Sequence, residues 1–189
     1  SIALVDANIR RIIREEIPTE APSFFMVDIQ PDQVEGFKKI MNDSTGVSDV
    51  AIVPMIRGRI VKLNDVPSEK AEVTREVKWA LSGDRGLTYG NPPDARTQVV
   101  SGEWWPADYK GPPLVSFASD LAEGMGLKVG DTITVNVLGR EIPLKIANLR
   151  RVDFSSAKMN FIMVVSPGVL ESAPHAHLAT ARVAPENED

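Results

Sequence analysis

The stretch TITVNVLGREIPLKIANL, residues 132–149, decides how the middle of this chain folds. Isoleucine, valine and leucine recur at every second position on both sides of a short connection at Gly139 and Arg140. This is the pattern of two strands that each turn one face toward a core. We interpret residues 132–138 and 141–149 as the strands of a hairpin joined by Gly139 and Arg140. A half-buried hairpin predicts a small sheet or barrel here.

The regions before and after this hairpin alternate between strand and helix patterns. Apolar runs of strand length predict strands, and the prolines at the start of the intervening segments fit a first helical turn. The expected elements are a strand at 23–29, a helix opening at Pro31 with the face Val34, Phe37, Ile40 and Met41, one long or two consecutive strands at 47–63 interrupted near Pro54, a strand at 160–165, a short helix at 167–171 and a strand at 178–183. Two β-α-β-like units are therefore expected to flank a strand-rich insert.

The insert contains weaker signals. Residues 73–81 alternate and predict a strand, and the glycine- and proline-rich residues 82–94 predict a loop. Residues 97–101 fit a short strand, and residues 117–125 fit a helix.

Composition narrows the function classes. The chain has 189 residues, 43% of them hydrophobic, which is enough for one large domain or two small lobes. Its net charge is −5 and it has no basic stripe, which disfavours nucleic acid as a partner. It has no cysteine, which excludes disulfides, thiolate metal sites and cysteine nucleophiles.

The beginning of the chain carries a helical pattern that starts without a methionine. Residues 2–17 place isoleucine and valine on one stripe, and Pro18 ends the pattern. The helix either packs on its own domain or continues a transmembrane helix as a stalk, and the pattern favours neither. Residues 185–189 fit an acidic linker. We expect the chain to be a soluble segment of a larger membrane-anchored protein.

Motifs for catalysis and cofactor binding are absent from the sequence. It has neither a phosphate-binding G-x-x-x-x-G-K-[S/T] loop nor a G-x-S-x-G nucleophile elbow. His175 and His177 could approach a metal together with Glu171, but a zinc site normally takes three or four ligands in a defined shell. We therefore predict no catalytic, cofactor-binding or metal-binding residue, and no enzyme activity.

An aromatic cluster is the most unusual local feature. Trp104 and Trp105 are adjacent and Tyr109 follows them. They are our candidate partner surface, as an exposed platform for a sugar, a lipid or a protein. A corner that packs one lobe onto another is the alternative that we favour.

Several segments resemble one known family. PSFFMVDIQPDQ at residues 22–33 is similar to the opening of the second periplasmic region of YbbP-type permeases, which belong to the FtsX-like and MacB-like permeases of ABC transporters. Further similar segments follow in the same order: RGRIVKLN at 57–64, GEWWP at 102–106, LKVGDT at 127–132, NLRRVDF at 148–154 and NF at 160–161.

The resemblance implies an α+β fold, a MacB-like periplasmic core. Residues 1–20 would form a juxtamembrane stalk helix. Residues 21–66 and 150–189 would form a porter-like β-α-β lobe, and residues 67–149 an inserted strand-rich lobe.

The same resemblance implies a non-catalytic periplasmic domain of a bacterial inner-membrane permease. Such a permease pairs with a cytoplasmic ABC ATPase and relays ATP-driven movement to the periplasm. YbbP-type systems are associated with hydrophobic or lipid-like compounds and with a periplasmic thioesterase/lysophospholipase. A secreted hydrolase or a stand-alone periplasmic binding module is the rival hypothesis.

Overall fold

The computed structural model describes residues 23–24, 27–90, 97–153 and 160–183, which form two compact units. The smaller unit takes in the described residues up to Val53 and those from Ala176 onward, and the larger unit contains Pro54–Ser156 and Asn160–His175. The helix expected at residues 2–17 and the linker at 185–189 lie outside the described residues.

The smaller unit packs one helix against strands. Helix α2 (Val34–Asp43) follows the 3-10 turn η1 (Pro31–Gln33) and buries Phe37 and Met41, as its apolar spacing predicts. Strands β1 (Ser23–Phe24) and β2 (Val27–Ile29) pair antiparallel with β11 (Ala176–Val183), which is also hydrogen-bonded to β3 (Val47–Leu63). The core of this unit is small, with Ile29, Ala179 and Ala181 facing the helix residues.

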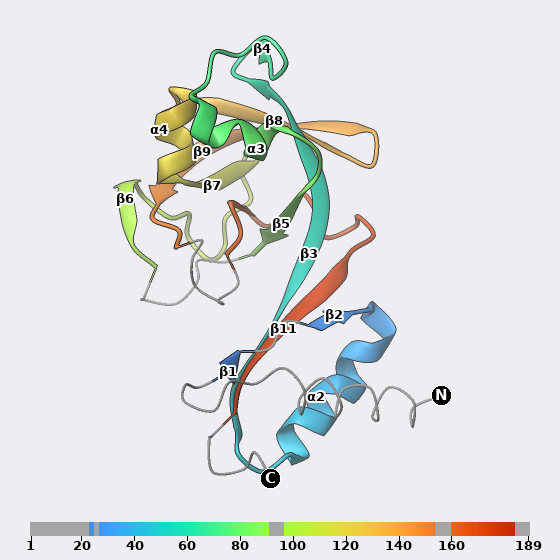
Figure 1. Ribbon diagram of the computed structural model, residues 1–189. Helices are drawn as coiled ribbons and strands as arrows, with labels where there is room; N and C mark the ends of the chain where they lie inside the picture. The colour runs from blue at the N-terminus through green and yellow to red at the C-terminus, as the bar shows by residue number, and fades with distance from the viewer. Residues whose placement is uncertain (1–22, 25–26, 91–96, 154–159, 184–189) are drawn as a thin grey trace. The chain divides into compact units, whose positions relative to one another are not determined.

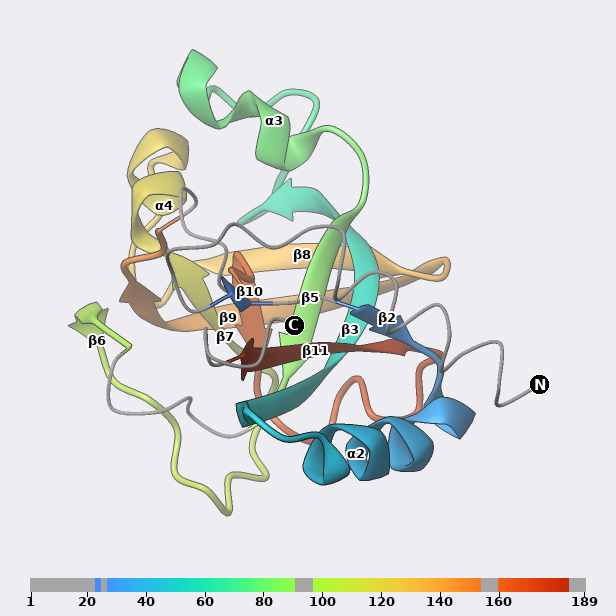
Figure 2. The ribbon, with the colours of Figure 1, turned by 60° about the horizontal axis from the view of Figure 1, so that its bottom comes forward.

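The larger unit is a closed barrel of six strands (Figures 1 and 2). Its order is β3, β5 (Arg85–Tyr89), β10 (Met163–Val165), β7 (Leu114–Ala118), β9 (Arg140–Arg150) and β8 (Thr132–Val137), and β8 returns to pair with β3. The β5–β10 and β7–β9 pairs are parallel, and the other four are antiparallel. Two short strands extend the barrel: β6 (Val99–Gly102) pairs with β9, and β4 (Val66–Pro67) pairs with the end of β3.

The barrel interior is filled by side chains. Ile60, Leu87, Val135 and Leu144 have no exposed surface, and they come from four different strands. Alternation along β8 and β9 points these residues inward and their polar neighbours outward, as residues 132–149 predict.

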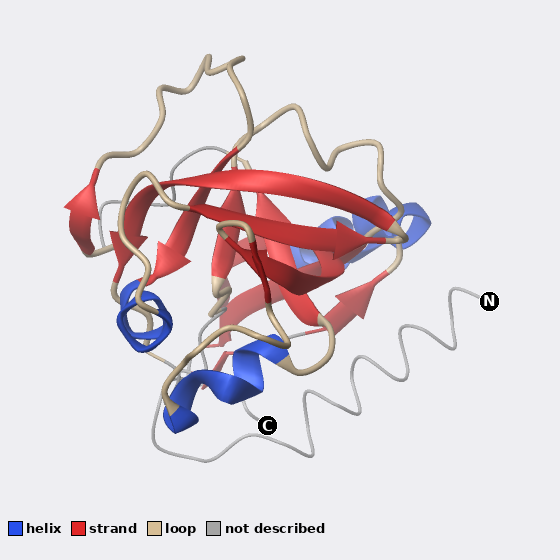
Figure 3. Ribbon diagram, turned by 90° about the horizontal axis from the view of Figure 1, so that it is seen from above, coloured by secondary structure: helices blue, strands red, loops and turns tan. Residues whose placement is uncertain are grey.

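Two helical segments replace features that we expected differently. The strand expected at residues 73–81 is wrong: these residues form the turn η2 (Arg75–Val77) and helix α3 (Lys78–Leu81), because Val77 and Ala80 are the buried pair, at helical spacing. Helix α4 (Ser119–Met125) starts two residues later than expected, because Phe117 belongs to strand β7. Both segments lie outside the strands (Figure 3).

Three further expectations need correction. Residues 85–89, inside the loop expected at 82–94, form the barrel strand β5, because Leu87 is buried where this strand pairs with β3 and β10. No helix forms at residues 167–171: all of residues 166–175 between β10 and β11 are described, and they make turns. The hairpin turn is shifted by one residue, because Val137 pairs with Arg140 and the connecting residues are Leu138 and Gly139. The MacB-like fold and the division into porter-like and inserted lobes stay predictions.

The corrected turn puts a leucine in an unusual backbone conformation. Leu138 has φ 51° and Gly139 has φ 83°, the positive pair of a type I′ turn. Such a turn favours Asn-Gly, because a branched side chain is disfavoured at positive φ.

We therefore expect Leu138→Asn to stabilise the chain. Relief of the left-handed backbone should raise the free energy of unfolding by about 1 kcal/mol. Thermal unfolding followed by circular dichroism measures this. Gly139→Asn, at the second turn position, serves as the control and should bring no such gain, because glycine already tolerates its φ.

Candidate functional site

The predicted aromatic surface lies in the segment between β6 and β7, and the structure divides it. Trp105 is only 3% exposed, and its indole Nε1 donates a hydrogen bond to the Gly90 carbonyl at 3.1 Å. Trp104 is half-buried and meets Trp105 edge to face, with ring centroids 5.1 Å apart. The half-buried Tyr109 is anchored separately, because its hydroxyl donates to the Pro112 carbonyl at 2.6 Å.

This arrangement corrects the candidate partner surface. Trp105 belongs to the interior of the larger unit and has almost no area left to offer a partner. The platform is reduced to Trp104 and Tyr109, each partly covered by its own segment.

A cavity that the sequence does not reveal lies on the outer side of β3, β8 and β9. Its volume is about 350 Å³, and its lining is mostly polar: Lys62, Asn64, Asp65, Thr132, Thr134, Glu141 and Pro143. The strand register explains the composition, because Lys62, Thr134 and Pro143 lie side by side and face away from the apolar interior.

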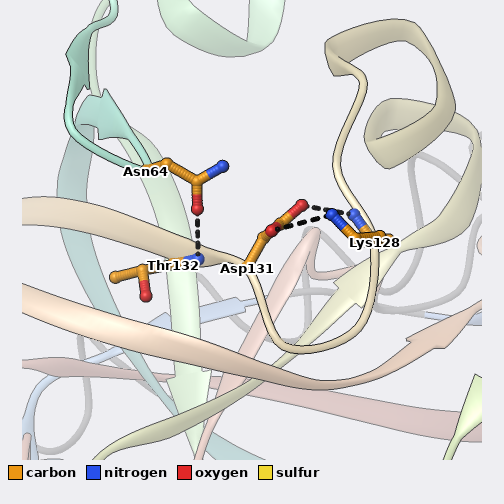
Figure 4. Close-up of polar contacts among 4 residues, drawn as sticks. All are labelled: Asn64, Lys128, Asp131 and Thr132. Atoms are coloured by element: carbon orange, nitrogen blue, oxygen red, sulfur yellow. Dashed lines mark hydrogen bonds and ion pairs between the residues drawn. The ribbon is translucent and has the colours of Figure 1, made fainter.

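The cavity residues are held by backbone contacts. Asn64 has φ 52°, and its side-chain Oδ1 accepts a hydrogen bond from the backbone amide of Thr132 at 3.0 Å (Figure 4). The backbone amide of Asn64 donates to the Thr132 carbonyl at 2.7 Å. The turn just before Thr132 is closed by Asp131, whose carboxylate accepts from the Lys128 amide at 2.9 Å (Figure 4). Lys62 Nζ lies 3.4 Å from Glu141 Oε2. The cavity can hold a small polar molecule. In its lining Lys62 and Glu141 pair with one another, and Asp65 adds a second carboxylate.

A buried polar network crosses the other side of the barrel. The Ser116 hydroxyl donates to Asn148 Oδ1 at 2.6 Å and accepts from Arg150 Nε at 3.0 Å. Arg150 also donates to the Phe161 carbonyl, and Asn148 Nδ2 to the Glu103 carbonyl. Among the described residues Arg150 has no carboxylate partner, and burial lowers the pKa of its guanidinium to about 10. The network ties β7, β9 and the chain before β10 together, and it includes no nucleophile with a base beside it.

The histidines do not converge on a metal site. His175 lies edge-on to Tyr89, with ring centroids 5.8 Å apart, and its Nδ1 is 2.6 Å from the Ala173 carbonyl. Burial, and to a lesser degree the charge of Glu171, raises the pKa of Tyr89. In the part of the chain that the structure describes, no three His, Asp or Glu side chains are grouped to hold a metal.

The chain is similar in sequence to part of an ABC transporter permease. The chain is 28% identical over 169 residues to YbbP of Escherichia coli strain K12, an uncharacterized ABC transporter permease. The match covers 89% of this chain and 20% of that permease, so the chain spans about a fifth of its relative's length. No protein-family model matches the chain. The similarity supports a relationship to ABC transporter permeases. None of the helices in the described residues has the length and apolarity to cross a bilayer.

The buried network predicts opposite effects for two hydroxyl deletions. Ser116→Ala leaves the Arg150 Nε donor and the Asn148 acceptor unpaired in the barrel, and should lower the free energy of unfolding by about 2–3 kcal/mol. The hydroxyl of Thr88 is buried without a hydrogen-bond partner among the described residues, so Thr88→Val should leave stability unchanged or raise it. Denaturant unfolding of both variants measures the contrast, and equal losses would contradict this role of Ser116.

Substitution of the two tryptophans should lower stability by different amounts. Trp105→Ala removes a fully packed ring and its hydrogen bond, and should lower the free energy of unfolding by about 3–5 kcal/mol. Trp104→Ala, in the half-buried position, should cost clearly less. Similar losses in denaturant unfolding would contradict the assignment of Trp105 to the interior and of Trp104 to a half-buried position.

Proposed function

We propose that this chain is a non-catalytic periplasmic domain of an ABC transporter permease. In this role it relays ATP-driven movement to the periplasm, for the handling of hydrophobic or lipid-like compounds at the inner membrane. The observation that carries the proposal is the similarity to a permease over 89% of the chain. A stand-alone enzyme or binding protein with this sequence would have no reason to align with a fifth of a permease over nearly its whole length.

The packed barrel supports a mechanical rather than a conducting role. Its interior is filled by apolar side chains such as Ile60 and Leu144, so cargo would pass along the outside of the larger unit. A closed and densely packed barrel deforms little, because packed interiors have low compressibility. Such a body can transmit a displacement as a unit.

The chemistry of the described polar sites fits the same role. Lys62 and Glu141 neutralise one another, and the buried arginine is used to tie strands together. Neither site combines a nucleophile, a base and an oxyanion donor, the set that a hydrolase with a serine or threonine nucleophile requires. The proposed partners rest on the resemblance to YbbP-type permeases: a cytoplasmic ABC ATPase, reached through the full-length permease and its flanking membrane helices, and a periplasmic thioesterase/lysophospholipase.

Cysteine labelling tests the location, because the chain itself has no cysteine to interfere. In the full-length protein, freed of cysteines elsewhere, Glu123→Cys places a thiol on the exposed side of α4 and Ala122→Cys places one on its buried side. We expect a membrane-impermeant maleimide, added to cells with a permeable outer membrane, to label the first variant. The second should react only after unfolding. Labelling of Glu123→Cys only after the inner membrane is opened would contradict a periplasmic location.

Affinity purification tests the partner. The tagged full-length protein should recover an ABC ATPase subunit. Recovery of a soluble protein without any ATPase would contradict the permease assignment. So would a gene sequence that encodes no apolar span of about 20 residues on either side of the chain.

A further inference from the structure

The tip of the β8–β9 hairpin exposes a leucine to solvent. Leu138 is 74% exposed, more than any other large apolar side chain that the structure describes. Figures 1 and 2 show the tip extending past β3. This side chain contributes nothing to the core, and its backbone occupies the left-handed region at φ 51°. A turn selected only for stability would carry asparagine or glycine here, so the outlier points to a role for the leucine side chain.

Three arginines lie at this end of the β3, β8 and β9 register, in a chain whose net charge is −5. Arg140 follows the turn directly, and Arg59 on β3 pairs with Asn136 at the end of β8. Arg57 and Arg59 face outward, because Gly58 between them faces Leu87 and Val137. All three arginines are exposed, and within the described ranges none forms an ion pair. The carboxylate of Glu141, the residue after Arg140, lies 3.4 Å from Lys62.

We propose that this basic tip, formed by Leu138, Arg57, Arg59 and Arg140, docks on a surface of anionic phospholipid. Leu138 would enter the boundary between headgroups and acyl chains while the guanidinium groups remain among the lipid phosphates. One exposed apolar side chain with cations at the adjoining strand positions is a minimal arrangement of an interfacial anchor. The proposal rests on this surface alone and is compatible with a permease beside a bilayer.

The size of the patch argues against an acidic protein as the occupant. A stable protein interface buries about 800 Å² on each partner with an apolar centre of several side chains. The basic tip offers a single apolar side chain. A lipid surface needs no matching pocket, and its charge is complementary to the three arginines.

Vesicle co-sedimentation of the 189-residue chain tests the proposal. The chain should sediment with vesicles of equal parts phosphatidylcholine and phosphatidylglycerol, but not with phosphatidylcholine alone. Binding should be lost at about 0.5 M salt, where screening removes the attraction of exposed charges. Leu138→Asn should weaken binding about tenfold, on the scale of burying one leucine side chain. Arg59→Gln and Arg140→Gln should each weaken it about fivefold.

Controls separate binding from folding. Leu138→Asn is expected to stabilise the chain, so a loss of binding by this variant cannot come from unfolding. Leu138→Phe should keep the binding, and Val100→Asn, at an exposed apolar position on β6, should not change it. Unchanged binding by Leu138→Asn would overturn the proposal. The proposal would also be overturned if the chain bound neither vesicle type while Leu138→Asn still impaired the full-length permease, because the tip would then contact a protein. Neither result bears on recovery of the ATPase, so the two proposals can fail separately.

Discussion

The larger unit depends on the pairing of β8 with β3. Five of the six pairings join all six strands into an open sheet, and the sixth, with Ile60 of β3 opposite Val135 of β8, closes the ring. An open sheet leaves unpaired edges and cannot enclose its inner side chains, whereas a closed barrel has no edge and surrounds them. Ile60 and Val135, which pair across this closure, are both fully buried, so closure and core filling involve the same residues. The bulge between Ile60 and Lys62 lets β3 bend at this closure.

Closure also explains where the polar groups go. Side chains that alternate with the core face outward along β3, β8 and β9, where they line the cavity around Lys62 and Thr134. On the opposite side, the parallel pairing of β7 with β9 brings Ser116 level with Asn148. Polar groups that are buried there must satisfy one another, and the hydroxyl of Ser116 does so by donating to one neighbour and accepting from the other. The barrel is thus polar at fixed positions and apolar everywhere between them.

The parts of the fold that follow from local periodicity could be predicted, and the parts that depend on long-range pairing could not. The hairpin strands and helix α2 each repeat their apolar spacing long enough to be unambiguous. Residues 75–81 do not, because a stretch of seven residues fits a strand or a helical turn equally well. Phe117 lies in the short run Leu114–Ala118, which is apolar except for Ser116 and whose strand or helix identity is set by its partners. Ser116 and Arg150 are far apart in the sequence, and the local sequence around each residue does not predict their hydrogen bond.

The hairpin turn fails for a different reason, and this failure is informative. Turn rules place glycine at the positions of positive φ, which led to Gly139 and Arg140 as the connection, but the chain puts Leu138 there instead. A barrel with a dense core can tolerate one unfavourable backbone conformation, since about 1 kcal/mol is small beside the contribution of its buried side chains. The surface of a closed barrel offers few places where an apolar group can project. The edges of its strands pair with neighbouring strands, and their outer faces carry polar side chains. A hairpin tip is such a place, so the residue that violates the turn rule stands where a side chain can reach farthest from the barrel.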